Sequence, residues 1–164
     1  MNHESFRAKT KLTYTSKTSK RVVSHTDTCF IYPDTMNAGY YIAMSLDTRK
    51  AAPGRDASEA YVNLIVALAG ALQHKAEHQP TAELGKRVDA KLRRRSRRAH
   101  RIEETDQLDL MRRALAKFTG IAIDDVELTS TNGLRATMVK ILEGTVVNDD
   151  AAVDSELVAN REKV

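Results

Sequence analysis

The chain has 164 residues, of which 41% are hydrophobic, enough for one domain with a buried core. Its net charge is +4 at pH 7, and a single cysteine with no tryptophan excludes an internal disulfide and predicts a mostly aliphatic core. No apolar run approaches the roughly 20 residues that span a bilayer, and the N-terminus lacks the apolar segment of a secretory signal. These features predict a cytoplasmic protein with no membrane partner.

The first 50 residues predict a small antiparallel sheet. Alternating or β-branched residues favour strands over 12–15, 21–32 and 39–46, and the short connections between them favour a three-stranded meander. Cys29 lies within the second strand, so we expect a buried structural thiol. Tyr40 and Tyr41 point to opposite faces of the third strand, so one of them should be exposed.

A long buried helix should follow a break at Pro53 and Gly54. Asp56 has the chemistry of an N-cap, and Glu59 stands three residues later as in a capping box. The apolar residues after it recur at helical spacing up to about His78, namely Tyr61, Leu64, Ile65, Leu68 and Leu72.

The most basic stretch runs from Lys86 to Arg101 and holds nine of the 26 Lys and Arg residues with one acid, Asp89. Helical spacing from residue 81 predicts an amphipathic helix whose aliphatic side consists of Leu84, Val88, Leu92, Ala99 and Ile102. The cations on its outer side are Lys86, Arg87, Lys91, Arg93, Arg94, Arg97, Arg98 and Arg101. Arg95 falls on the aliphatic side, where we expect it to snorkel or to pair with an acid.

The apolar phase changes near 103–106, which predicts a new helix with Thr105 as its N-cap and Gly120 after its end. Its apolar stripe consists of Leu108, Met111, Leu115 and Phe118. A last helix is expected over 134–142, with a hairpin turning at Asn132–Gly133 as the alternative. Together these elements predict an α+β fold in which about three strands are followed by about four helices, helix-dominated. Residues 1–144 should form one domain, with its sheet in 1–50 and its helices in 56–144, and the acidic residues 145–164 a flexible tail.

The basic stretch carries the functional prediction. Arginines bind phosphates through a planar fork, and cations without acidic neighbours are typical of a nucleic-acid-binding surface. We therefore expect a non-catalytic nucleic-acid-binding protein, without cofactor or metal, that contacts phosphates through the eight outer cations. Whether the nucleic acid is DNA or RNA, and whether the protein self-associates, is left open. The alternative is a small adaptor, inhibitor or assembly subunit whose basic helix docks on an acidic protein, and the segment 93–98 also fits a nuclear localisation patch.

Two further motifs compete with this interpretation. Ala116, Gly120 and Val126 have the spacing by which the stretch resembles the helix–turn–helix of repressor-type regulators, although Asp124 and Asp125 in its second helix would repel phosphates. His74, Glu77 and His78 match the H-x-x-E-H pattern of zinc peptidases. All three lie away from the apolar stripe of their helix, at its end, which predicts exposure instead of a cleft.

Overall fold

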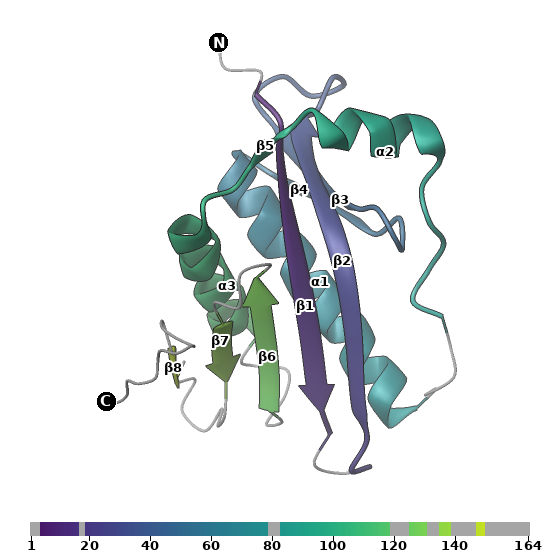
Figure 1. The fold of residues 1–164 in the computed structure, drawn as a ribbon, viewed down its shortest axis with the longest axis vertical. Coiled ribbons are helices and arrows are strands. Elements are labelled where there is room, and N and C mark those ends of the chain that lie inside the picture. Colours follow the sequence, from purple (N-terminus) through teal and green to yellow (C-terminus); the bar gives the residue numbers. More distant parts are fainter. Residues whose placement is uncertain are drawn as a thin grey trace.

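The computed structural model describes residues 4–16, 19–78, 83–118, 125–130, 135–138 and 147–149 of the chain (Figure 1). The elements in chain order are β1 (Phe6–Thr15), β2 (Val22–Pro33), β3 (Tyr41–Ser45), β4 (Ala51–Gly54), α1 (Ala57–Glu77), α2 (Ala90–Arg97), β5 (His100–Arg101), α3 (Glu104–Phe118), β6 (Asp125–Ser130), β7 (Arg135–Met138) and β8 (Val147–Asp149).

The strands belong to one sheet with the order β4-β3-β2-β1-β6-β7-β8, in which every neighbouring pair is antiparallel. The short β5 pairs in parallel with the start of β1, through Phe6↔His100 and Arg7↔Arg101. The predicted helix-dominated architecture of about three strands and about four helices is therefore wrong: the described residues form eight strands and three helices, and the sheet is the centre of the fold. The strands extend the sheet on both sides of the predicted meander.

The meander itself is confirmed, because β1, β2 and β3 are consecutive antiparallel neighbours. β1 begins at Phe6, earlier than predicted, and pairs with β2 along its whole length. The segment around Pro53 forms β4, which pairs with β3 only. Proline is tolerated on such an edge strand because its missing N–H need not face a neighbouring strand. The sequence around Pro53 and Gly54, which predicted a break between elements, therefore forms a strand.

α1 follows the sequence pattern closely. Asp56 is its N-cap and accepts a hydrogen bond from the Glu59 amide at 2.8 Å, while Glu59 Oε1 accepts from the Arg55 amide at 2.6 Å. The whole predicted apolar stripe of this helix is buried against the sheet. The Asp56 and Glu59 carboxylates therefore satisfy backbone amides at the start of α1, and burial of the apolar stripe stabilises the rest of the helix.

A buried polar network joins α1, α3 and β1 within this core. Gln107 Nε2 donates to the Lys9 carbonyl at 3.1 Å and to Thr10 Oγ1 at 3.0 Å, and the Tyr61 hydroxyl lies 2.6 Å from Thr10 Oγ1. Burial raises the pKa of Tyr61, so the phenol stays protonated. Each polar group has a partner, which avoids the cost of burying it unpaired.

The predicted helix over 81–101 is wrong for most of its length, since α2 spans Ala90–Arg97 alone. Asp89 is its N-cap and accepts from the Leu92 amide at 3.0 Å. The residues just before it run along the β3–β4 connection, where the Val88 amide donates to the Leu46 carbonyl at 2.9 Å. Gly85 is required there, because a Cβ at this position would lie 2.1 Å from the Thr48 carbonyl oxygen. Tertiary pairing thus overrides the helical periodicity of this segment.

α3 begins at Glu104, so Thr105 lies inside the helix instead of capping it. Its predicted apolar stripe is buried in full, which confirms the second helix and the change of phase. The predicted C-terminal residue Gly120 falls outside the described residues.

The predicted last helix is also wrong, because residues 135–138 form β7. β6 and β7 pair antiparallel through Thr129↔Arg135 and Leu128↔Ala136, as the hairpin alternative requires. Val126 lies in β6, so the structure excludes the second helix of a helix–turn–helix there. β6 covers the edge of β1, whose backbone groups would otherwise lack partners. β8, within the predicted acidic tail, pairs with β7.

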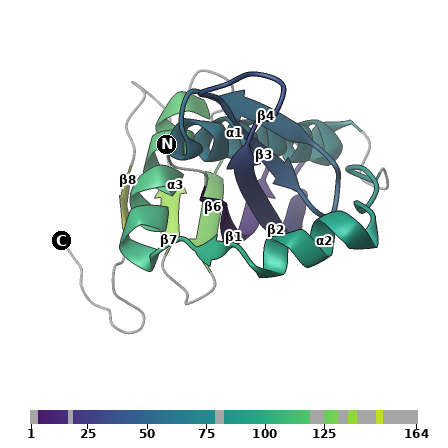
Figure 2. The same ribbon diagram turned by 90° about the horizontal axis from the view of Figure 1, so that it is seen from above.

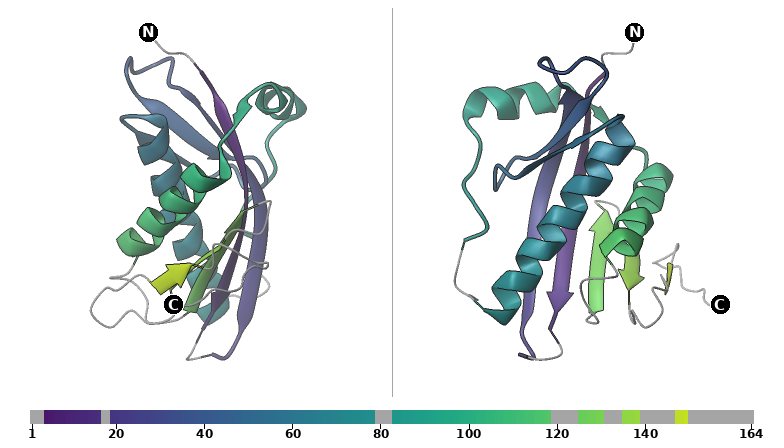
Figure 3. Two further views of the ribbon diagram at one scale, coloured as in Figure 1. Left: turned by 60° about the vertical axis from the view of Figure 1, so that its left-hand side comes forward. Right: turned by 180° about the vertical axis from the view of Figure 1, so that it is seen from behind.

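The helices divide between the two faces of the sheet. α1 and α3 cover one face, and α2 crosses one end of the other (Figures 2 and 3). We call this second face the open face, since the described helices leave most of it uncovered. None of the helices in the described ranges combines the length and apolarity needed to cross a membrane.

Candidate nucleic-acid interface

α2 is anchored on the open face by a small apolar cluster of its own. Phe30 and Leu46 of the sheet side meet Val88 and Ala99, which flank the helix. Tyr32, Met44 and Leu92 pack around them. Val88, Leu92 and Ala99 belong to the predicted aliphatic side, and the other two members, Leu84 and Ile102, pack on the main core. The prediction of burial therefore holds, although a continuous helix does not produce it.

Arg95 is exposed like Arg94 and Arg97, and none of the described ion pairs joins it to an acid, so the predicted acidic partner is not found. Its guanidinium carbon lies 5.5 Å from the Phe30 ring centre and 5.4 Å from that of Tyr32. Burial raises the pKa of Tyr32, and the Arg95 charge works against that rise. A cation over two rings adds attraction to the anchoring of α2, so this arginine holds the helix while its neighbours face outward.

The outward cations of α2 and its C-cap are exposed, namely Lys91, Arg94, Arg97 and Arg98. Of the ion pairs found between described residues, none involves an α2 side chain. Arg94 and Arg98 are four residues apart, a spacing at which like charges repel by a few tenths of a kcal/mol. The helix thus concentrates charge that nothing in the described fold neutralises.

The remaining predicted contacts are placed differently. Lys86 and Arg87 precede the helix, and Arg87 Nε lies 3.7 Å from Asp47 Oδ1. Arg93 is half-buried, and its Nε has no hydrogen-bond partner among the described groups. Arg101 is exposed on β5. The structure therefore gathers half of the eight predicted cations on one helix surface and spreads the others around it.

The sequence interpretation expected the basic N-terminal segment to assist binding, but it did not name three cations of β1 as contacts. Arg7, Lys9 and Lys11 occupy alternate positions of the strand and so point to the open face, opposite the buried Ala8 and Thr10. Their spacing of two was the available signal, but the first predicted strand began at residue 12. α2 and β1 together make the open face basic.

Asp27 is the centre of a buried polar group in the described part of the sheet. Asp27 accepts from the Ser45 hydroxyl and lies 2.8 Å from His25 Nε2. Both groups bind the carboxylate instead of each other, so the three residues do not have the serine–histidine–aspartate order of a catalytic triad. Cys29 is fully buried as predicted, and burial raises the pKa of its thiol, with Asp27 adding to the rise.

The zinc-peptidase pattern ends on the protein surface. His74 and His78 are exposed, as predicted, and their ring centres are 4.9 Å apart. Glu77 accepts a hydrogen bond from the Tyr14 hydroxyl at 3.3 Å. Within the described ranges no group of three or more His, Cys, Asp or Glu side chains is placed to hold a metal ion.

Protein-family models, curated proteins and solved structures gave no match to this chain. A function can therefore be inferred only from the placement of its own side chains.

Proposed function

We propose that the protein binds nucleic acid without catalysis, through the outward cations of α2 and the adjoining open face of the sheet. The observation that carries this proposal is the group of exposed cations formed by Lys91, Arg94, Arg97 and Arg98, in which no acid intervenes. Phosphates relieve the mutual repulsion of such a group and release counterions when they bind. We also propose a cytoplasmic location, because a chain with a single cysteine fits a reducing compartment.

The way α2 is fixed supports a rigid, phosphate-reading surface. Its inner side is occupied by the apolar cluster, and Arg95 covers the rings of Phe30 and Tyr32. Phe30 is buried and Tyr32 is half-buried with Arg95 over its ring, so neither offers a freely exposed ring for stacking on bases, the usual means of recognising single strands. We expect contacts to phosphate and sugar to dominate, with little preference for base sequence.

Salt dependence tests the proposal. We expect the full chain to bind fluorescently labelled duplex DNA or structured RNA at low ionic strength, followed by anisotropy. The logarithm of the association constant should fall with the logarithm of salt concentration with a slope of about −4, one phosphate for each of the four cations.

Two results would contradict this expectation. Absence of binding to both nucleic acids at low salt removes the proposal. Binding to poly-glutamate, with no binding to either nucleic acid, replaces it with docking on an acidic protein.

A further inference from the structure

A cavity of about 320 Å³ opens beside β1 at a gap in the sheet. β5 pairs with β1 only at Phe6 and Arg7, and β6 pairs with it only from Thr10 onward. Ala8 and Lys9 therefore face a notch between the two strands. The residues that line this notch are Arg7, Ala8, Lys9, Thr28, Arg101 and Gln107.

The charges around the notch are of one sign. Arg7 and Arg101 are direct partners across a parallel strand pair, so their side chains project from the same face of the sheet. Lys9 follows Arg7 on that face two residues later. Like charges placed opposite each other destabilise a sheet, and no acid is among the lining residues to offset them.

Arg7 has a hydrogen-bond donor without an acceptor among the described groups. Its Nε is buried, and no group in the described part of the chain accepts a hydrogen bond from it. Buried donors in native proteins are nearly always paired, and an unpaired one calls for an ion or water. An oxyanion in the notch would supply the acceptor and the opposite charge together.

The notch is preformed by the buried polar network. Gln107 bonds to the Lys9 carbonyl and to Thr10 Oγ1, at the point where none of the described strands pairs with β1 on that side. The Gln107 amide also donates to the Tyr61 hydroxyl at 3.2 Å. The Gln107 side chain beside the notch is thus fixed by three acceptors, so binding of a ligand would not have to order it.

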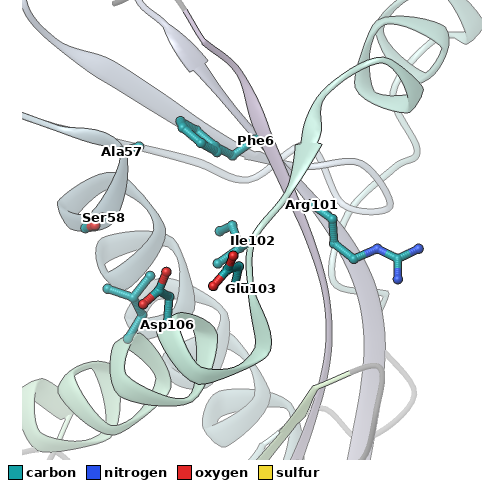
Figure 4. Close-up of a pocket in the computed structure, with 8 residues that line it drawn as sticks. Phe6, Ala57, Ser58, Arg101, Ile102, Glu103 and Asp106 are labelled. Carbon is teal, nitrogen blue, oxygen red and sulfur yellow. The ribbon is translucent and has the colours of Figure 1, made fainter.

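Three acids lie near β5: Glu4, whose Oε2 is 3.6 Å from His100 Nε2, and Glu103 and Asp106, which line a second cavity. Glu103 and Asp106 line a space of about 200 Å³ together with Phe6 and Ser58. Figure 4 shows the Arg101 side chain extending away from both carboxylates, across β1. Arg101 contributes to the lining of both cavities, but neither Glu103 nor Asp106 lines the notch.

We propose that the notch is a binding site for a phosphate group, held by the guanidinium groups of Arg7 and Arg101 with Lys9 beside them. Arginine forks match phosphate oxygens in pairs, which suits two arginines on adjacent strands. A free phosphate, a nucleotide and a phosphate of a nucleic acid present the same chemistry. The proposal stands on the notch alone and does not require that α2 bind nucleic acid.

Calorimetric titration of the full chain with inorganic phosphate, and separately with a nucleoside 5′-monophosphate, tests the site in chloride-containing Hepes buffer. We expect saturable binding, weakened about tenfold or more by Arg101→Gln, since each bond between charged groups is lost with its partner. Lys9→Gln should weaken it in the same direction. Arg113→Gln on α3 removes the same charge at an exposed position far from the notch and should leave the affinity unchanged.

Absence of saturable binding to both probes overturns the proposal, and so does equal binding by wild type and Arg101→Gln. Nucleic-acid binding without binding of either small probe would contradict a phosphate site in the notch and leave the proposed role of α2 intact. In supporting cases, comparison of one oligonucleotide with and without a 5′-phosphate identifies the source. Higher affinity with the 5′-phosphate would show that the notch binds the phosphate at a strand end. Equal affinity would show that it binds internal or free phosphates.

Discussion

Replacing Arg94, Arg97 and Arg98 together by alanine should weaken binding to duplex DNA or structured RNA by about 100-fold, because three exposed charge-assisted contacts contribute about 1 kcal/mol each. The salt slope should become shallower by about 3, one unit for each lost phosphate contact. All three side chains are exposed and none takes part in the cluster that anchors α2. Anisotropy titrations at several salt concentrations measure both effects, and circular dichroism checks that the fold is retained.

The matched control removes the same charge from the other side of the sheet. Arg55, Arg113 and Lys117 are exposed near or on α1 and α3, and their triple replacement by alanine should reduce binding only slightly. Equal losses in the two variants would show that net charge, and not the surface of α2, governs association. Retained binding in the α2 variant would exclude this helix as the site.

Phe30→Ala should lower the free energy of unfolding by about 3–5 kcal/mol, as loss of a fully buried aromatic side chain does. Phe30 is 1% exposed and is the contact that joins β2, Leu46, Val88 and Ala99 beneath α2. The change also removes one of the two rings under Arg95. Urea denaturation followed by circular dichroism measures the loss of stability.

Met36→Ala is the control for that measurement. Met36 is 86% exposed, so its truncation should change the unfolding free energy by less than about 0.5 kcal/mol. A loss below about 1 kcal/mol for Phe30→Ala would mean that the cluster does not support α2. In that case the rigid placement of the outward cations would lose its physical basis.

Local patterns predicted those parts of the fold in which one element buries one apolar face. α1 has a cap and a stripe of five buried residues, and the meander strands are β-branched and closely connected. The same reasoning failed for β7, because four residues carry too little periodicity to distinguish helix from strand. Pairing with β6, which itself covers the edge of β1, decided that choice, and such pairing is a property of the folded sheet.

The basic stretch shows what periodicity can and cannot determine. Leu84, Val88 and Ala99 are spaced as on a helix, and each is at least partly buried. Only Ala90–Arg97 is helical, because Asp89 caps the helix and the residues before it follow Leu46 and Thr48. Spacing identified which side chains turn inward, while contacts distant in sequence determined the backbone that carries them.

The candidate site was predicted in the same partial way. The exposed arginines of α2 were predicted because charge density is a local property of sequence. The pairing of Arg7 with Arg101 joins residues far apart in the chain, and it depends on a parallel contact of two residues. No short-range pattern specifies such a contact, so the notch became visible only in the folded sheet.

Mapping of amide chemical shifts on the labelled full chain, during titration with a short DNA duplex and then an RNA hairpin, tests the binding surface most directly. We expect the perturbed amides to cluster in 90–101 and in 7–11, which lie on α2, β5 and the exposed part of β1. The amides of α1 and of the second half of α3 should move little, since the sheet separates them from the open face. Perturbations concentrated in 57–77 or 110–118, or none with either nucleic acid, would contradict binding through α2 and the open face.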